Sequence, residues 1–142
     1  MKTKALGLDL GDASLGIAIS DDYKQFARGL KNVRFEQGDT NTPLEKTLEI
    51  LDNEPIDVIV LGYPKNMDGS IGVQAKKSEA FKAAIEKHSS VQVILLDERL
   101  TSKMANQTMI GNKKKRKKRK ATIDQTSAVV LLQNYLDTGK GE

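Results

Sequence analysis

The sequence KALGLDL at residues 4–10 and the sequence LGIAIS at residues 15–20 decide the fold, together with the segment GDAS that joins them. Both longer segments are rich in apolar, strand-forming residues, and GDAS has the composition of a turn. Another turn signal, Asp21-Asp22, follows the second segment. The chain is therefore expected to open with a β-hairpin.

The next stretch predicts an outer strand and then a helix. Residues 26–35 are interpreted as the third strand, although their apolar and polar residues alternate imperfectly. Thr42 is the expected N-cap of the helix, with Pro43 in the first helical position and Glu45 completing a capping box. The helix is expected to end before Pro55, after leucines at helical spacing: Leu44, Leu48 and Leu51.

Two short apolar runs follow, at residues 57–62 and 91–96. Such continuous runs are typical of strands buried on both faces. Between them we expect a loop over residues 63–70 and a helix over residues 71–88, where apolar residues recur among helix formers.

Two further helices complete the predicted order. Thr101 can cap a short helix that reaches about Ile110, and a capping box at residues 122–125 opens the last helix. Three strands in a meander, followed by alternating helices and strands, predict the α/β class: a mixed five-stranded sheet with helices on both faces, as in the ribonuclease H-like fold. A doubly wound sheet is the alternative, but it would be expected to alternate strand and helix from the start.

Length and composition exclude several function classes. The 142 residues fit one domain, expected over residues 1–142. With no Cys, the chain has no disulfide framework, no thiolate zinc site and no cysteine nucleophile, and the single histidine, His88, disfavours a serine-type triad. We expect a cytoplasmic protein, since the start lacks the apolar core of a signal peptide and no stretch approaches the ~18 apolar residues of a membrane span.

The positive charge is concentrated in one segment. The formal net charge is +4, yet outside one run of eight cations the chain has 15 basic and 19 acidic residues. A self-repelling run of this kind predicts a mobile loop, here over residues 111–121, that binds the phosphates of a nucleic acid. The alternative is a solvated loop without a partner. The run consists of Lys113, Lys114, Lys115, Arg116, Lys117, Lys118, Arg119 and Lys120.

Carboxylates occur at three places that the predicted fold brings together. Asp9 interrupts an apolar strand, where a charge is unfavourable unless it is paired or binds a metal. Glu98 follows another strand, and Asp124 lies in the first turn of the last helix, where the helix dipole alone could also account for it. Three converging carboxylates predict a Mg²⁺ or Mn²⁺ site, and two such ions can drive phosphodiester hydrolysis.

Four motifs carry a resemblance to a known family: LDLG at residues 8–11, GYPKNMDG at 62–69, DERLT at 97–101, and ID with SAV at 123–129. Together, over nearly the whole chain, they resemble the YqgF family, also called RuvX. The resemblance implies a ribonuclease H-like nuclease, related to the Holliday-junction resolvases, that matures the 5′ end of precursor 16S ribosomal RNA in bacteria.

The resemblance also implies a set of site residues. The acidic triad of the family falls on Asp9, Glu98 and Asp124 as catalytic and metal-binding residues. Arg99 is expected to contact a phosphate or, alternatively, to pair with a carboxylate, and Asn66 is expected to border the nucleic acid or to serve an ordinary turn. The sequence departs from the family at Asp12-Ala13-Ser14-Leu15, which is more acidic and lacks a nearby cation, and the basic run is longer than usual.

The main hypothesis is a metal-dependent endonuclease that cuts structured RNA, with precursor ribosomal RNA or a ribosomal particle as partner. A Holliday-junction DNA resolvase, expected to act as a dimer, is the closest alternative. A non-catalytic RNA-binding assembly factor is another, and the small number of aromatic residues would make its binding mainly electrostatic. An actin-like nucleotide binder is disfavoured by length. Monomer and dimer both stay open.

Overall fold

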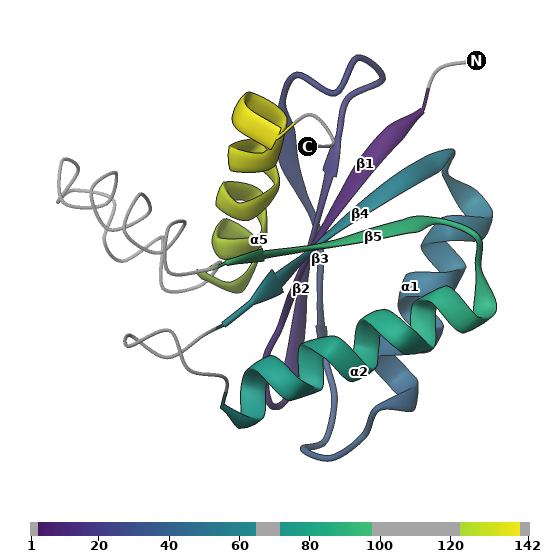
Figure 1. The fold of residues 1–142 in the computed structure, drawn as a ribbon, viewed down its shortest axis with the longest axis vertical. Coiled ribbons are helices and arrows are strands. Elements are labelled where there is room, and N and C mark those ends of the chain that lie inside the picture. The colour runs from purple at the N-terminus through teal and green to yellow at the C-terminus, as the bar shows by residue number, and fades with distance from the viewer. Residues whose placement is uncertain (1–2, 65–71, 98–122, 140–142) are drawn as a thin grey trace, which may run out of the picture.

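The computed structural model describes residues 3–64, 72–97 and 123–139 of the chain. Five strands form one sheet in the order β3-β2-β1-β4-β5 (Figure 1). The first three strands pair antiparallel, whereas β4 and β5 run parallel to β1. The bounds are Lys4–Leu10 for β1, Ser14–Ser20 for β2, Ala27–Arg34 for β3, Ile56–Tyr63 for β4 and Gln92–Asp97 for β5.

Helices cover both faces of this sheet, with α1 (Asn41–Asn53) and α2 (Val73–His88) on one face and α5 (Ile123–Asn134) on the other (Figure 1). A π-helical segment, Tyr135–Gly139, continues α5. Each face holds its own apolar core. The predicted fold class, a mixed five-stranded α/β sheet between helices, is confirmed. Within the described residues, no helix combines the length and the apolar character needed to cross a membrane.

The central strand β1 alternates between the two cores. Leu6 and Leu8 are fully buried in the core beneath α1 and α2, and Ala5 is fully buried in the core beneath α5. Gly7 also faces α5, and a Cβ atom there would lie 2.7 Å from Cβ of Leu132. The missing side chain at position 7 therefore allows α5 to pack directly on the strand.

The predicted cap of the first helix is wrong. The helix begins at Asn41, two residues before Pro43, and its N-cap position is Thr40. Asp39 supplies the capping oxygens, because its Oδ1 accepts the backbone N–H groups of Asn41 and Thr42 at 3.0 and 3.1 Å. The Thr42 hydroxyl donates to Asp39 Oδ2 at 2.6 Å, so Thr42 is a donor inside the first turn rather than the cap.

Other element boundaries shift by one or two residues. β4 continues through Tyr63, where a loop was expected to begin, because Tyr63 pairs with Asp97 of β5. The Tyr63 hydroxyl donates to Glu79 of α2, and this bond raises the pKa of Tyr63. The predicted helix over residues 101–110 and the start of the predicted capping box at Thr122 lie outside the described residues.

Candidate active site

Asp9 lies near the carboxyl end of the central strand, on the face that α5 covers. Side chains alternate along a strand, so Asp9 shares this face with Ala5 and Gly7. The residue is partly buried. A carboxylate is thus held near the end of the central strand, two residues before the turn that begins at Gly11.

Glycines flank Asp9 on both neighbouring strands. Gly16 of β2 is its direct cross-strand partner. On the other side Leu8 pairs with Leu61 of β4, so the next residue of β4, Gly62, is level with Asp9. Glycine in a strand interior marks a place where another backbone or a ligand can approach closely. The sequence carried this signal, but the two glycines were not singled out as site residues.

The row of paired residues that crosses the sheet through Asp9 and Gly16 ends at Asn32 of β3, which pairs with Gly16. Its Oδ1 is buried and accepts no hydrogen bond among the described residues. Asn32 lies two strands from Asp9, about 10 Å by ordinary strand spacing, with only glycine between them. Asp9 and Asn32 therefore carry side-chain oxygens on either side of Gly16, and oxygen is the ligand type that Mg²⁺ and Mn²⁺ prefer.

The first turn of α5 lies at the level of Asp9. Gly7 contacts Ala128 and Leu132, and Gln133 hydrogen-bonds the start of β3, at the end of the sheet where β1 begins. The helix therefore runs antiparallel to β1. Asp124 is one turn before Ala128, about 6 Å along the helix, and Asp9 is two residues, about 7 Å, beyond Gly7. The backbone at residue 124 thus lies beside the strand position of Asp9.

The other predicted site residues follow β5 or lie in segments that are not described. Asp97 is the last residue of β5, and Leu96 before it packs in the α5-side core. Asn66, Glu98, Arg99 and the basic run at residues 113–120 lie outside the described residues. Within the described part of the chain, no three potential ligands (His, Cys, Asp or Glu) form a cluster able to hold a metal ion.

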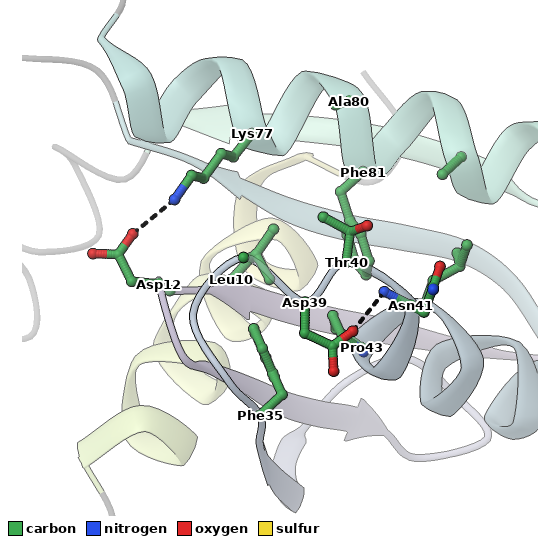
Figure 2. Close-up of a pocket in the computed structure, with 14 residues that line it drawn as sticks. Leu10, Asp12, Phe35, Asp39, Thr40, Asn41, Pro43, Lys77, Ala80 and Phe81 are labelled. Atoms are coloured by element: carbon green, nitrogen blue, oxygen red, sulfur yellow. Dashed lines mark hydrogen bonds and ion pairs between the residues drawn. The ribbon is translucent and has the colours of Figure 1, made fainter.

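A cavity of about 390 Å³ lies on the opposite face of the sheet, between α1, α2 and the end of β1 (Figure 2). Its walls are mainly apolar and include Leu10, Phe35 and Phe81. Because Leu10 and Asp9 are consecutive strand residues, they project to opposite faces, and the cavity is separate from the Asp9 site.

The rim of this cavity is acidic and internally paired. Asp12 Oδ1 lies 3.0 Å from Nζ of Lys77 (Figure 2), and the Lys77 ammonium, with Gln74, holds the pKa of Asp12 below its usual value. On the other side, the Thr42 hydroxyl and two backbone N–H groups lower the pKa of Asp39. Asp12, which has no cation nearby in the sequence, thus receives one from α2. Both carboxylates at the mouth of this cavity therefore already have hydrogen-bond donors within the protein.

Comparison with known proteins identifies the family. A profile of the RuvX family, described as Holliday junction resolvase, matches residues 3–138. The chain belongs to the RuvX family. Curated relatives match this chain over nearly their whole length. Those from Shouchella clausii and Bacillus subtilis are both named "Putative pre-16S rRNA nuclease". The former is 40% identical over 94% of each chain, and the latter is 39% identical over 95% of this chain and 98% of the relative.

Solved structures show the same fold at low sequence identity. RuvC of Thermus thermophilus, solved with a Holliday junction substrate, superposes with a TM-score of 0.58 at 12% identity, over 96% of each chain. The fowlpox virus Holliday junction resolvase superposes with a TM-score of 0.53 at 14% identity, covering 96% of this chain and 99% of the viral one. The predicted resemblance and the ribonuclease H-like fold are both confirmed, and RuvX is a family of nucleases, hydrolases of phosphodiester bonds.

Proposed function

We propose that this RuvX protein is a metal-dependent endonuclease that cuts structured RNA in the cytoplasm and matures the 5′ end of precursor 16S ribosomal RNA. The observation that carries the proposal is the position of Asp9, a partly buried carboxylate at the end of the central strand, flanked by Gly16 and Gly62. The names of relatives about 40% identical over nearly the full length support RNA as the substrate.

Asp9, Glu98 and Asp124 are proposed to hold Mg²⁺ or Mn²⁺, with two ions at the site. When bound, such ions supply an activated water and stabilise the leaving oxygen of a phosphodiester. Asp9 contributes a hard oxygen ligand that the strand holds in a fixed place. Glycine at the positions beside it, Gly16 and Gly62, suits a close approach of the sugar–phosphate backbone to that carboxylate.

Substrate binding is assigned to residues beyond the carboxylates. Arg99, next to Glu98 in the sequence, is proposed to contact a phosphate near the cut, and Asn66 to border the substrate. The eight cations from Lys113 to Lys120 are proposed to hold the RNA backbone by displacing its counterions. In this scheme the charged run supplies affinity and the carboxylates supply the chemistry.

Resolution of a four-way DNA junction is the second candidate. It is favoured by the description of the family profile and by the fold shared with resolvases. A resolvase would be expected to present two active sites to one junction, and therefore to act as a dimer.

Cleavage of end-labelled precursor 16S RNA tests the proposal, with Mn²⁺ or Mg²⁺ and with an Asp9→Asn control prepared identically. We expect metal-dependent cutting that the control lacks. A four-way DNA junction assayed in parallel separates the two candidates. Cutting of the junction alone would replace RNA by DNA as the substrate, and equal cutting by wild type and control would reveal a contaminating nuclease.

A further inference from the structure

A β-bulge in β3 places two cations side by side. Lys31 pairs with Ile17 and Gly29 pairs with Ala18, so Leu30 is the extra residue. Without the bulge, Arg28 and Lys31 would face opposite sides of the sheet, because their separation is odd. With it, Arg28 pairs with Ile19, and both cations share the face of Ile17 and Ile19.

The cations of β3 lack the ion pairs that most other cations in the described part of the chain form. Arg28, Lys31 and Arg34 are all exposed, and none of their side chains forms an ion pair or hydrogen bond with another described residue. By contrast, five lysines elsewhere lie within 4.0 Å of a carboxylate oxygen: Lys4, Lys24, Lys46, Lys77 and Lys82. The guanidinium and ammonium groups of β3 are therefore available to an external anion.

An exposed aromatic ring on a well-bonded backbone precedes these cations. Phe26 is 69% exposed, yet its N–H donates to Asp21 Oδ1 at 3.0 Å and its carbonyl accepts from the Asp21 N–H at 3.1 Å. On either side, the Gln25 carbonyl and the Ala27 N–H bond to the side chain of Gln133 in α5, at 2.9 and 2.8 Å. The ring is thus presented to solvent from a fixed position.

We propose that the open edge of β3, from Phe26 through Arg28 and Lys31 to Arg34, binds a single-stranded RNA segment that flanks the cut site. This edge surface deepens the proposed function and rests on it for the identity of the polymer. A stacking ring needs an unpaired base, which favours a single strand over a duplex. The three cations are suited to the phosphates of that strand.

The edge surface leads toward Asp9. Arg34 pairs with Ser14, which lies on the α5-covered face two residues before Gly16, the partner of Asp9. From Phe26 to Arg34 the strand covers about 27 Å. An RNA strand leaving the Asp9 site would therefore meet Arg34 first, cross the open edge, and then meet Lys31 and Arg28.

Two acidic residues near the ring of Phe26 limit where phosphates can bind on the edge surface. Asp21 is engaged by the backbone of the hairpin, and Asp22 lies 3.9 Å from Nζ of Lys4. Both repel phosphates near Phe26. The phosphate contacts are therefore assigned to Arg28, Lys31 and Arg34, and base stacking to Phe26.

Binding is tested in the cleavage-deficient Asp9→Asn protein, with a fluorescent RNA hairpin that is blunt or carries a single-stranded extension of about ten nucleotides. The variant Arg28→Glu/Lys31→Glu is compared with Lys76→Glu/Lys87→Glu, which makes the same charge change at two exposed, unpaired lysines of α2. We expect the β3 variant to bind the extended RNA about tenfold more weakly than the α2 variant, with a salt slope lower by about 1.4, because two fewer phosphates are neutralised. The blunt hairpin should bind both variants equally.

Phe26→Ala separates stacking from charge. It should weaken binding of the extended RNA about fivefold and leave the salt slope unchanged, while Phe26→Leu retains part of the affinity. Equal affinities for the β3 and α2 variants would overturn the proposal. Self-association of the β3 variant with normal RNA binding would also overturn it, and would show that the cations protect an open sheet edge. Because binding is measured without cleavage, a preference for extended RNA would stand even if the wild type proved unable to cut RNA.

Discussion

Gly7 of β1 and Leu132 of α5 are in such close contact that a Cβ atom at position 7 would come within 2.7 Å of Cβ of Leu132 and 3.1 Å of the Ala128 carbonyl oxygen. One of these neighbours is helix backbone, which cannot rotate away. The distance between the central strand and α5, and with it the position of the first turn of α5 beside Asp9, therefore depends on glycine at this position.

Gly7→Ala should lower the free energy of unfolding by about 1–3 kcal/mol, because the added methyl forces α5 away from the sheet. It should also reduce cleavage, since the first turn of α5 would move relative to Asp9. Urea denaturation followed by circular dichroism measures the first effect. Gly11→Ala is the matched control, because its Cβ would meet Ser14 at an ordinary 3.5 Å. A Gly7→Ala protein as stable as this control would show that α5 adjusts freely.

Asp124→Asn should abolish cleavage while the fold and the affinity for RNA stay nearly intact, because the charge proposed to bind the metal is lost and the side-chain volume hardly changes. Asp137→Asn serves as the control at the other end of the same helical region, where Asp137 is exposed and accepts a hydrogen bond from Gln133. Single-turnover cleavage with Mn²⁺ measures both variants. Residual activity in Asp124→Asn comparable to that of Asp137→Asn would remove residue 124 from the site.

Serine at all eight positions from Lys113 to Lys120 should weaken RNA binding and flatten its dependence on salt. For single-stranded RNA, the salt slope falls by about 0.7 for each phosphate that the protein no longer neutralises. Fluorescence anisotropy at several salt concentrations gives this slope. An unchanged slope would show that the run does not bind the RNA.

Asp39→Ala should destabilise the start of α1 more than Glu45→Ala does, since Asp39 accepts the N–H groups at the start of the helix. Thermal melts of the two variants give the comparison. The pKa of Asp39 is lowered from 3.8 in the folded protein, so its contribution to stability is present above pH 3.8 and is lost as the pH falls below that value. The difference in melting temperature between wild type and Asp39→Ala should therefore shrink below pH 3.8. A constant difference down to lower pH would exclude the ionised carboxylate as the cap.

Sequence reasoning succeeded where one signal dominates. The apolar runs and the turn at Gly11 predicted the hairpin and the two parallel strands. The charge of Asp9 within an apolar strand singled out this residue, and its role in the site stays a prediction. Sequence reasoning failed at the start of α1, because Asp39 and Thr42 are both good capping residues and the path of the chain decides between them. It missed the end of β4, since the pairing of Tyr63 with Asp97 is a tertiary contact.

The bulge at Leu30 also depends on a tertiary contact that the sequence alone does not reveal. The imperfect alternation over residues 26–35 was visible in the sequence, but a bulge is defined by the partner strand, and that partner is known only from the register with β2. For the candidate site, the structure places Asp9 and the backbone of residue 124 at one end of the sheet. Glu98, Arg99, Asn66 and the basic run stay predictions from the sequence.

α5 covers β1, β2 and β3, so the order of synthesis decides when these strands become buried. Gln133 bonds to Ala27 across 106 positions of the chain, so the two partners leave the ribosome far apart in time. Until α5 is synthesised, the apolar face formed by Ala5, Ala18, Val58 and Val60 has no cover, and Asp9 lacks the helix that completes its surroundings. A nascent chain that stops short of α5 therefore exposes one apolar face of its opening strands, and the α5-side core forms only once the last helix has been made.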